Sequence, residues 1–115
     1  MITIVETLQF IKESEKLLTE FEKDKLFQYI ASQPGKGALI TGTGGVRKLR
    51  FATKVKGKRS GVRVIYYYFN DNNPVFLFYI YGKNQKIDLS EDDKKMLYDV
   101  VQKMKKKMRG SIKND

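Results

Sequence analysis

Two strongly apolar runs on either side of a turn constrain the fold of this chain more than any other feature. Residues 62–69 read VRVIYYYF, residues 75–81 read VFLFYIY, and NDNNP at 70–74 separates them. Runs rich in β-branched and aromatic residues are typical of strands, and clusters of Asn, Asp and Pro mark turns. The second run has no polar interruption, which predicts a central strand buried on both faces. The chain is therefore expected to fold around an antiparallel strand pair.

The remaining elements follow from shorter patterns. Residues 2–5 (ITIV) predict a short strand, and apolar residues at helical spacing predict a helix that ends before Thr19. TEFE at 19–22 has the spacing of a capping box, so a second helix is expected to start there and to stop at QPGKG, residues 33–37. Residues 46–54 predict a further strand, with GTGG at 42–45 as a flexible lead-in. SEDD at 90–93 starts a final amphipathic helix that is expected to end near Gly110.

The predicted order is β-α-α-β-β-β-α. We expect an α+β fold in which the helices pack on one face of a small, antiparallel-rich sheet. At 115 residues the chain is long enough for one domain. We assign residues 1–109 to that domain and residues 110–115 to a short basic and polar tail.

Positive charge is concentrated in the middle of the chain. Residues 34–89 contain eleven basic and two acidic side chains, a net charge of +9 out of +10 for the whole protein. Within this part, GTGGVRKLRFATKVKGKRSGVR, residues 42–63, has eight basic side chains and no acid. Such segregation is typical of a surface that binds a polyanion. The alternative is a solvated basic face that serves solubility.

Strand alternation predicts where these charges point. If Leu49 and Phe51 face the core, Lys48 and Arg50 point together to the other side. In the last strand the same alternation places Phe76, Phe78 and Ile80 on one face, and Tyr79, Tyr81 and Lys83 on the opposite face. A sheet covered on one side would then leave an open face lined by Lys48, Arg50, Arg63, Tyr81 and Lys83. Cations neutralise phosphates and aromatic rings stack on unpaired bases, a combination suited to single-stranded nucleic acid. The alternative is that the tyrosines at 66–68 and 79 are simply core or rim residues of a small sheet.

The composition narrows the possible chemistry. The chain contains no His and no Cys, which excludes Ser-His-Asp and Cys-His nucleophile systems and metal sites built on either residue. GTGG lacks the downstream residues of a phosphate-binding loop, so no cofactor is expected. An enzyme acting on RNA would have to use Lys, Arg and Tyr, with the RNA 2′-OH as nucleophile. Neighbouring cations disfavour each other's charged form, which would make it easier for a Lys to lose its proton and act as a general base. The absence of a signal peptide pattern and of a long apolar segment predicts a cytoplasmic protein without a membrane anchor.

The residues also resemble a known family. The GTGG run followed by an aliphatic residue and RK, the basic turn into GVRVIYY, and YGKNQKIDLS before the last helix resemble HigB-type toxins of the RelE/ParE superfamily. The resemblance covers the domain to about residue 105. It implies a RelE-like fold and the toxin half of a type II toxin–antitoxin pair. It further implies a ribosome-dependent mRNA endonuclease, an mRNA interferase that inhibits translation by cutting mRNA in the 30S A site without a metal.

The resemblance also implies roles for individual residues. Lys48 and Arg50 match the family's paired basic residues, Arg63 matches the Arg beside the tyrosine-rich strand, and Lys83 falls in a Gly-Lys element after the last strand. Lys48 is the candidate base, Arg50 and Arg63 would stabilise the phosphate, and Lys83 or Lys86 would protonate the leaving oxygen. The further residues expected to bind RNA are Arg47, Lys54, Lys56, Lys58, Arg59, Tyr81 and Lys86. The sequence departs from the RelE pattern in having Arg at position 50 and no matching Tyr near the last helix.

Two other functions stay open at this point. The ParE branch of the superfamily poisons DNA gyrase, and a plain RNA-binding module or an inactive toxin has the same charge pattern. The resemblance also implies a cognate HigA-like antitoxin with an acidic segment, forming a hetero-oligomer with this chain. The antitoxin's contact could cover the basic face or lie against the helices.

Overall fold

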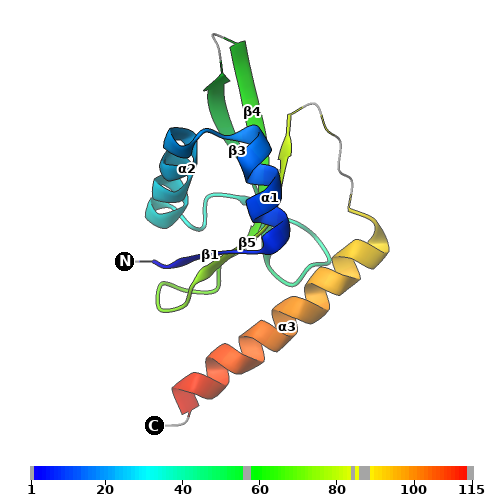
Figure 1. The fold of residues 1–115 in the computed structure, drawn as a ribbon. Helices are drawn as coiled ribbons and strands as arrows, with labels where there is room; N and C mark the ends of the chain where they lie inside the picture. Colours follow the sequence, from blue (N-terminus) through cyan, green and yellow to red (C-terminus); the bar gives the residue numbers. More distant parts are fainter. Residues whose placement is uncertain (1, 56–57, 84, 86–88, 114–115) are drawn as a thin grey trace.

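The fold is a five-stranded mixed sheet with three helices (Figure 1). The computed structural model describes the backbone of residues 2–55, 58–83, 85 and 89–113, and of these the side chains except those of 54, 55, 58–60 and 110–113. The strand order is β1-β5-β4-β3-β2. The strands are β1 (Ile4–Glu6), β2 (Ala38–Leu39), β3 (Val46–Val55), β4 (Lys58–Tyr67) and β5 (Val75–Gly82). The α+β class and the antiparallel-rich sheet are confirmed: β1 pairs parallel with β5, and the other three pairings are antiparallel.

Helices α1 (Leu8–Leu17) and α2 (Glu20–Ser32) form the predicted pair. The capping box is present, because Thr19 Oγ1 accepts from the Glu22 amide at 3.1 Å and Glu22 Oε1 accepts from the Thr19 amide at 3.0 Å. These two bonds satisfy backbone donors that a helix start leaves unpaired. The second helix therefore begins where the sequence predicted.

The position of helix α3 (Glu91–Lys113) differs from the prediction that all helices pack on one face of the sheet. One core cluster joins α1 and α2 to the sheet, with Phe10, Leu26, Leu49 and Val64 among its members. A second cluster, which we call the α3 cluster, lies on the other face. It consists of Val46, Ile65, Tyr67, Phe78, Tyr81, Leu97 and Val101. The helices therefore cover both faces, and Figure 1 shows α3 well apart from α1 and α2. A central strand with no polar face requires this second cover.

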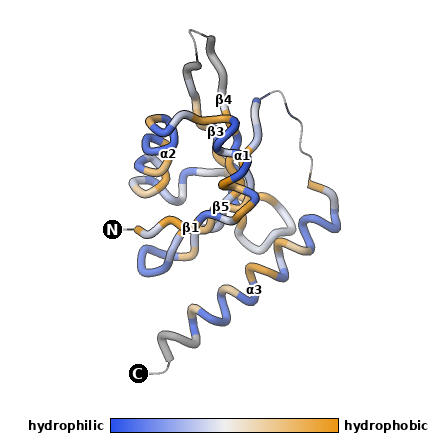
Figure 2. The backbone as a smooth tube through the Cα atoms, in the orientation of Figure 1, coloured by the Kyte–Doolittle hydropathy of each residue, from blue (hydrophilic) through white to orange (hydrophobic). Residues whose placement is uncertain are grey.

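The length of α3 also differs from the prediction. The helix continues through Gly110 to Lys113, so residues expected in the tail are helical. A glycine inside a helix costs only about 1 kcal/mol relative to Ala, and it does not by itself end the helix. Figure 2 shows hydrophobic and hydrophilic residues alternating along α3, the pattern of a helix with one buried face.

A β-bulge changes the predicted alternation of β5. Ile65 pairs with Tyr79 but Tyr66 pairs with Leu77, which leaves Phe78 as an extra residue. Thr7, the N-cap of α1, fixes this point, since its hydroxyl donates to the Phe78 carbonyl at 2.9 Å and its amide donates to the Leu77 carbonyl at 3.1 Å. As a result Phe78 packs in the α3 cluster, whereas Ile80 packs against α1 and α2. The predicted common face of Phe76, Phe78 and Ile80 is therefore wrong.

The GTGG segment leads directly into β3, as predicted, and it is a defined turn that contacts α3. Gly42, Gly44 and Gly45 have positive φ angles of 85°, 76° and 126°. Thr43 is buried, and its hydroxyl donates to the Ile40 carbonyl at 2.7 Å and accepts from the Val46 amide at 3.1 Å. Lys105 Nζ donates to the Gly44 carbonyl at 3.2 Å. The turn thus connects the edge of the sheet to the middle of α3.

Substitution at Gly44 tests this connection. A Cβ there would lie 3.0 Å from Tyr98 Cδ2, and the positive φ is costly for any other residue. We expect Gly44→Ala to lower the free energy of unfolding by about 1–3 kcal/mol, measured by urea denaturation. Gly35→Ala is the matched control: no heavy atom lies within 4 Å of its added Cβ, so stability should stay within about 0.5 kcal/mol. Equal effects of the two substitutions would show that the turn does not constrain the fold.

Two adjacent buried tyrosines make a second test. Tyr66 accepts from the Gly37 amide at 2.9 Å and donates to the Pro34 carbonyl at 2.8 Å. The Tyr67 hydroxyl is also buried, but it forms no hydrogen bond within the part of the chain that the structure describes. Burial raises the pKa of both phenols. Removing an oxygen whose partner stays buried costs about 1–3 kcal/mol, whereas removing an unpaired one relieves a penalty.

We therefore expect Tyr66→Phe to destabilise the protein by about 1–3 kcal/mol and Tyr67→Phe to be neutral or stabilising. Thermal and urea unfolding of the two variants at pH 7 measures this difference. A loss for Tyr67→Phe as large as that for Tyr66→Phe would contradict the hydrogen-bond assignment.

Candidate RNA-binding face and cleft

Three predicted cations lie side by side on the sheet. In the β3–β4 register Arg50 is opposite Arg63, and in the β4–β5 register Arg63 is opposite Tyr81. Lys48 is two residues before Arg50 on β3 and therefore shares its face. Side chains directly opposite one another on neighbouring strands have Cβ atoms about 4.5–5.5 Å apart. We call Lys48, Arg50 and Arg63 the basic row.

The basic row lies on the same face as α3 and borders the α3 cluster, since Lys48 is opposite Ile65 in the β3–β4 register. Lys48 and Arg50 are exposed and Arg63 is half-buried. Among the residues that the structure describes, no carboxylate forms an ion pair with any of the three. Within the part of the chain that the structure describes, the Arg63 guanidinium makes one long hydrogen bond, 3.5 Å, to the Val62 carbonyl. The row therefore presents positive charge that an anion can reach and that no carboxylate of the described residues offsets by an ion pair.

Two predicted residues occupy different environments from those expected. Tyr81 shares the face of the basic row, but only 5% of its surface is exposed because its ring packs in the α3 cluster. It is not an open stacking platform. Arg47 points to the opposite face, where its guanidinium donates to the carbonyls of Gly35 at 3.0 Å and Gly37 at 2.7 Å. Arg47 thus hydrogen-bonds to the segment after α2, and it is not part of the basic row.

The other predicted residues lie at the ends of the strands or outside the description. Lys83 is exposed and directly follows β5, and its amide donates to the Gly61 carbonyl at 2.9 Å. That bond holds Lys83 at the end of the sheet where Arg63 lies. Lys54, Lys58 and Arg59 belong to the β3–β4 hairpin, but their side chains are outside the described residues. Lys56 and Lys86 are entirely outside them.

A cleft of about 470 Å³ adjoins the basic row, and we call it the α3 cleft. It lies between the sheet and the start of α3 and is lined by Ala38, Leu39, Ile40, Lys48, Ile65, Tyr81, Leu89 and Lys94. Lys48 thus belongs both to the basic row and to the cleft wall. Sequence reasoning missed Leu39, Ile40 and Lys94. Leu39 lies on a two-residue edge strand, and Lys94 on a helix predicted to pack elsewhere, so no local pattern indicated them.

A second cleft, of about 550 Å³, has a different character. It lies beside the end of α2, and Tyr68 and Asp71 line it. Tyr68 donates to Asp71 Oδ1 at 2.6 Å, and this hydrogen bond raises the pKa of the phenol. A carboxylate that is already paired with a phenol, with no cation in the described lining, repels phosphate. The basic row and the α3 cleft are therefore the better candidate for nucleic acid.

Among the described residues, no group of three or more acidic side chains is placed to hold a metal ion. None of the three helices, as far as their residues are described, is long and apolar enough to cross a bilayer.

Comparison with known families agrees with this geometry. The profile of the family described as "RelE toxin of RelE / RelB toxin-antitoxin system" matches residues 19–114. The match includes α2, all strands except β1, and α3, and hence the whole basic row and α3 cleft. It extends over most of the sequence. The chain belongs to the RelE toxin family, the toxins of type II toxin–antitoxin systems.

Proposed function

We propose that this toxin is a ribosome-dependent mRNA endoribonuclease of the HigB type, acting in the cytoplasm. The observation that carries the proposal is the basic row, three cations from two neighbouring strands on one accessible face with no carboxylate paired to them in the described structure. Such an arrangement binds a phosphodiester and stabilises the additional negative charge of a pentacoordinate phosphorus.

The reaction that fits these side chains uses the RNA as its own nucleophile. The 2′-oxygen attacks the adjacent phosphorus and the bond from phosphorus to the 5′-oxygen breaks, which leaves a 2′,3′-cyclic phosphate and a 5′-hydroxyl. Lys48 accepts the 2′-OH proton, and Arg50 and Arg63 neutralise the phosphorane oxygens. Lys83, held at the same end of the sheet, donates a proton to the leaving 5′-oxygen. Lys86 is the alternative donor and lies outside the described residues.

Dependence on the ribosome follows from the openness of the basic row. Lys48 and Arg50 are exposed, so the protein alone does little to align the 2′-oxygen, the phosphorus and the leaving oxygen. Alignment of reacting groups contributes a large part of the rate in such reactions. A ribosome that holds mRNA in a fixed path in the 30S A site would supply it.

The first test is primer extension on an mRNA undergoing translation. We expect the double variant Lys48→Ala, Arg63→Ala to lose cleavage by about a hundredfold or more, because both a proton acceptor and a phosphate ligand are removed. In the wild-type reaction the downstream fragment should carry a 5′-hydroxyl, so that polynucleotide kinase labels it without prior phosphatase treatment.

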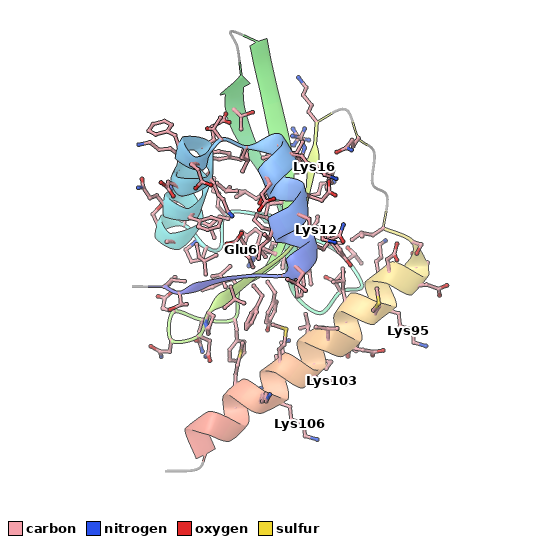
Figure 3. All side chains as sticks on the ribbon, viewed as in Figure 1. Glu6, Lys12, Lys16, Lys95, Lys103 and Lys106 are labelled. Atoms are coloured by element: carbon pink, nitrogen blue, oxygen red, sulfur yellow. The ribbon has the colours of Figure 1, made fainter. Side chains whose placement is uncertain are left out.

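The matched control is Lys12→Ala, Lys25→Ala, which removes the same charge from α1 and α2 on the other side of the sheet (Figure 3 labels Lys12). This control should cleave like the wild type. Equal cleavage by the basic-row variant and the control would contradict the roles assigned to Lys48 and Arg63. Inhibition of gyrase supercoiling by a wild-type protein that leaves translated mRNA intact would instead support the ParE-like function.

We further infer that the partner is a HigA-like antitoxin whose acidic segment covers the basic row. An exposed surface with this charge binds RNA indiscriminately unless a partner neutralises it. Opposite charge also steers the two proteins together and fixes the register of the contact. The complex would then be a hetero-oligomer in which the toxin face is closed.

Lysine acetylation of the free and bound toxin tests this inference, with the Arg63→Ala variant used to limit toxicity. Binding of the antitoxin should reduce the modification of Lys48 and Lys83, both exposed in the free protein, by about tenfold. Lys12 and Lys25 are the internal controls and should react equally in both states. Protection of Lys12 and Lys25 without protection of Lys48 would place the antitoxin on the helices instead.

A further inference from the structure

We propose that the α3 cleft receives one unstacked nucleobase next to the phosphate bound by the basic row, and that Lys94 selects a base with hydrogen-bond acceptors on its edge. The inference rests on the proposed function and extends it to a specificity-determining residue. Lys48 connects the two parts, because it belongs to the basic row and also lines the cleft. A nucleotide whose phosphate contacts Lys48 therefore has the cleft within reach of its base.

The cleft has the chemistry that a base requires. Ile65 is 2% exposed and forms a buried wall, whereas Leu39 is 63% exposed at the edge strand and forms an apolar lip. Ile40 and Leu89 add further apolar surface. A nucleobase has two apolar faces and a polar rim, and sites for such ligands combine apolar walls with a few polar groups. A volume of about 470 Å³ accommodates one base with its sugar.

The charges around Lys94 favour a base over a phosphate. The Glu91 carboxylate lies 3.5 Å from Lys94 Nζ, and Asp92 and Asp93 follow in the same first turn. These acids offset the ammonium charge and repel a second phosphate. The ammonium group nevertheless retains N–H donors, since it has three and one carboxylate contact uses only part of them. Lys94 is thus a hydrogen-bond donor in a locally neutralised setting, unlike the basic row, which has no ion-paired carboxylate among the described residues.

Lys94 is held in place by the GTGG turn. Its side chain is only 28% exposed, and its Cδ lies 3.8 Å from the position that a Cβ on Gly42 would occupy. Gly42 itself adopts φ +85°, a conformation that glycine takes readily. The aliphatic part of Lys94 therefore lies beside the turn, and its side chain lines the cleft. A positioned donor discriminates between bases in a way that a freely rotating surface lysine does not.

The donor character of Lys94 predicts which base is preferred. Lysine has no acceptor, so it pairs with O6 and N7 of guanine but meets the N6 amino donor on the corresponding edge of adenine. A good contact of this kind is worth about 1–3 kcal/mol, which corresponds to roughly 5- to 150-fold. Among purines we therefore expect guanine to be favoured over adenine in the cleft.

The test maps cleavage sites on a translated mRNA library with wild type, Lys94→Met and Lys94→Arg. The wild type should prefer guanine over adenine next to the cut by about tenfold. Lys94→Met keeps an apolar stem but no donor, so it should still cut, with the preference reduced to near parity. Lys94→Arg keeps donors and should retain the preference. Lys95→Met is the control, because Lys95 is exposed and points away from the sheet (Figure 3).

A binding measurement separates this inference from the proposed function. Guanosine and adenosine 5′-monophosphate are titrated into the protein while the methyl resonances of Ile40 and Ile65 are followed by NMR. Guanosine monophosphate should shift both methyls at lower concentration than the adenosine nucleotide, and Lys94→Met should remove the difference. Shifts without mRNA cleavage would overturn the nuclease and keep the base site. Cleavage with a Lys94-independent base profile, or no shift at Ile40 and Ile65, would overturn the base site alone.

Discussion

The candidate site depends on one boundary, at which the α3 face of the sheet changes from apolar to cationic. Along β3 the side chains on this face run from buried Val46 to exposed Lys48 and Arg50, and along β4 they run from Tyr67 and Ile65 to Arg63. Helix α3 covers the apolar end, because only there does burial lower the free energy. Where the cations begin, cover would cost desolvation of charge, so the sheet stays open. The α3 cleft lies at this change of character, which is why the proposed site puts a base against apolar surface and its phosphate among the cations.

The bulge at Phe78 brings side chains of a third strand, β5, to this boundary on the α3 face. A strict alternation from Phe76 would place Tyr79 and Tyr81 against α1 and α2. The extra residue moves both to the α3 face, so that Tyr81 becomes the cross-strand neighbour of Arg63 and a wall of the cleft. The cost of the interruption is offset locally, since the hydroxyl and amide of Thr7 satisfy the carbonyls of Phe78 and Leu77. The start of α1 therefore contributes to a site on the opposite face of the sheet.

The sequence predicted those parts of the fold and site that depend on residues close together in the chain, such as alternating apolar and charged side chains. Lys48 and Arg50 alternate with Leu49 and Phe51, so their common face could be read from the chain, and Thr19 with Glu22 marked a helix start. Features of the fold and site that depend on residues distant in the chain could not be predicted from the sequence. Arg47 belongs to the same basic run as Lys48, but its role follows from carbonyls twelve and ten residues away. Nothing within β5 indicates that Phe78 is the extra residue, because Thr7 supplies its partner.

The glycines of the GTGG turn show how a backbone requirement becomes a property of the site. Three left-handed residues in four positions allow the chain to turn tightly enough for Tyr98 and Gln102 of α3 to pack directly on Gly44. This contact and the bond from Lys105 to the Gly44 carbonyl fix the helix relative to β3. Because Lys94 is one helical turn before Tyr98, the same contact determines where its ammonium group lies beside the cleft. In the proposed base site, a motif without the residues of a phosphate-binding loop thus still contributes to nucleotide recognition, because it sets the position of a helix and does not contact a phosphate itself.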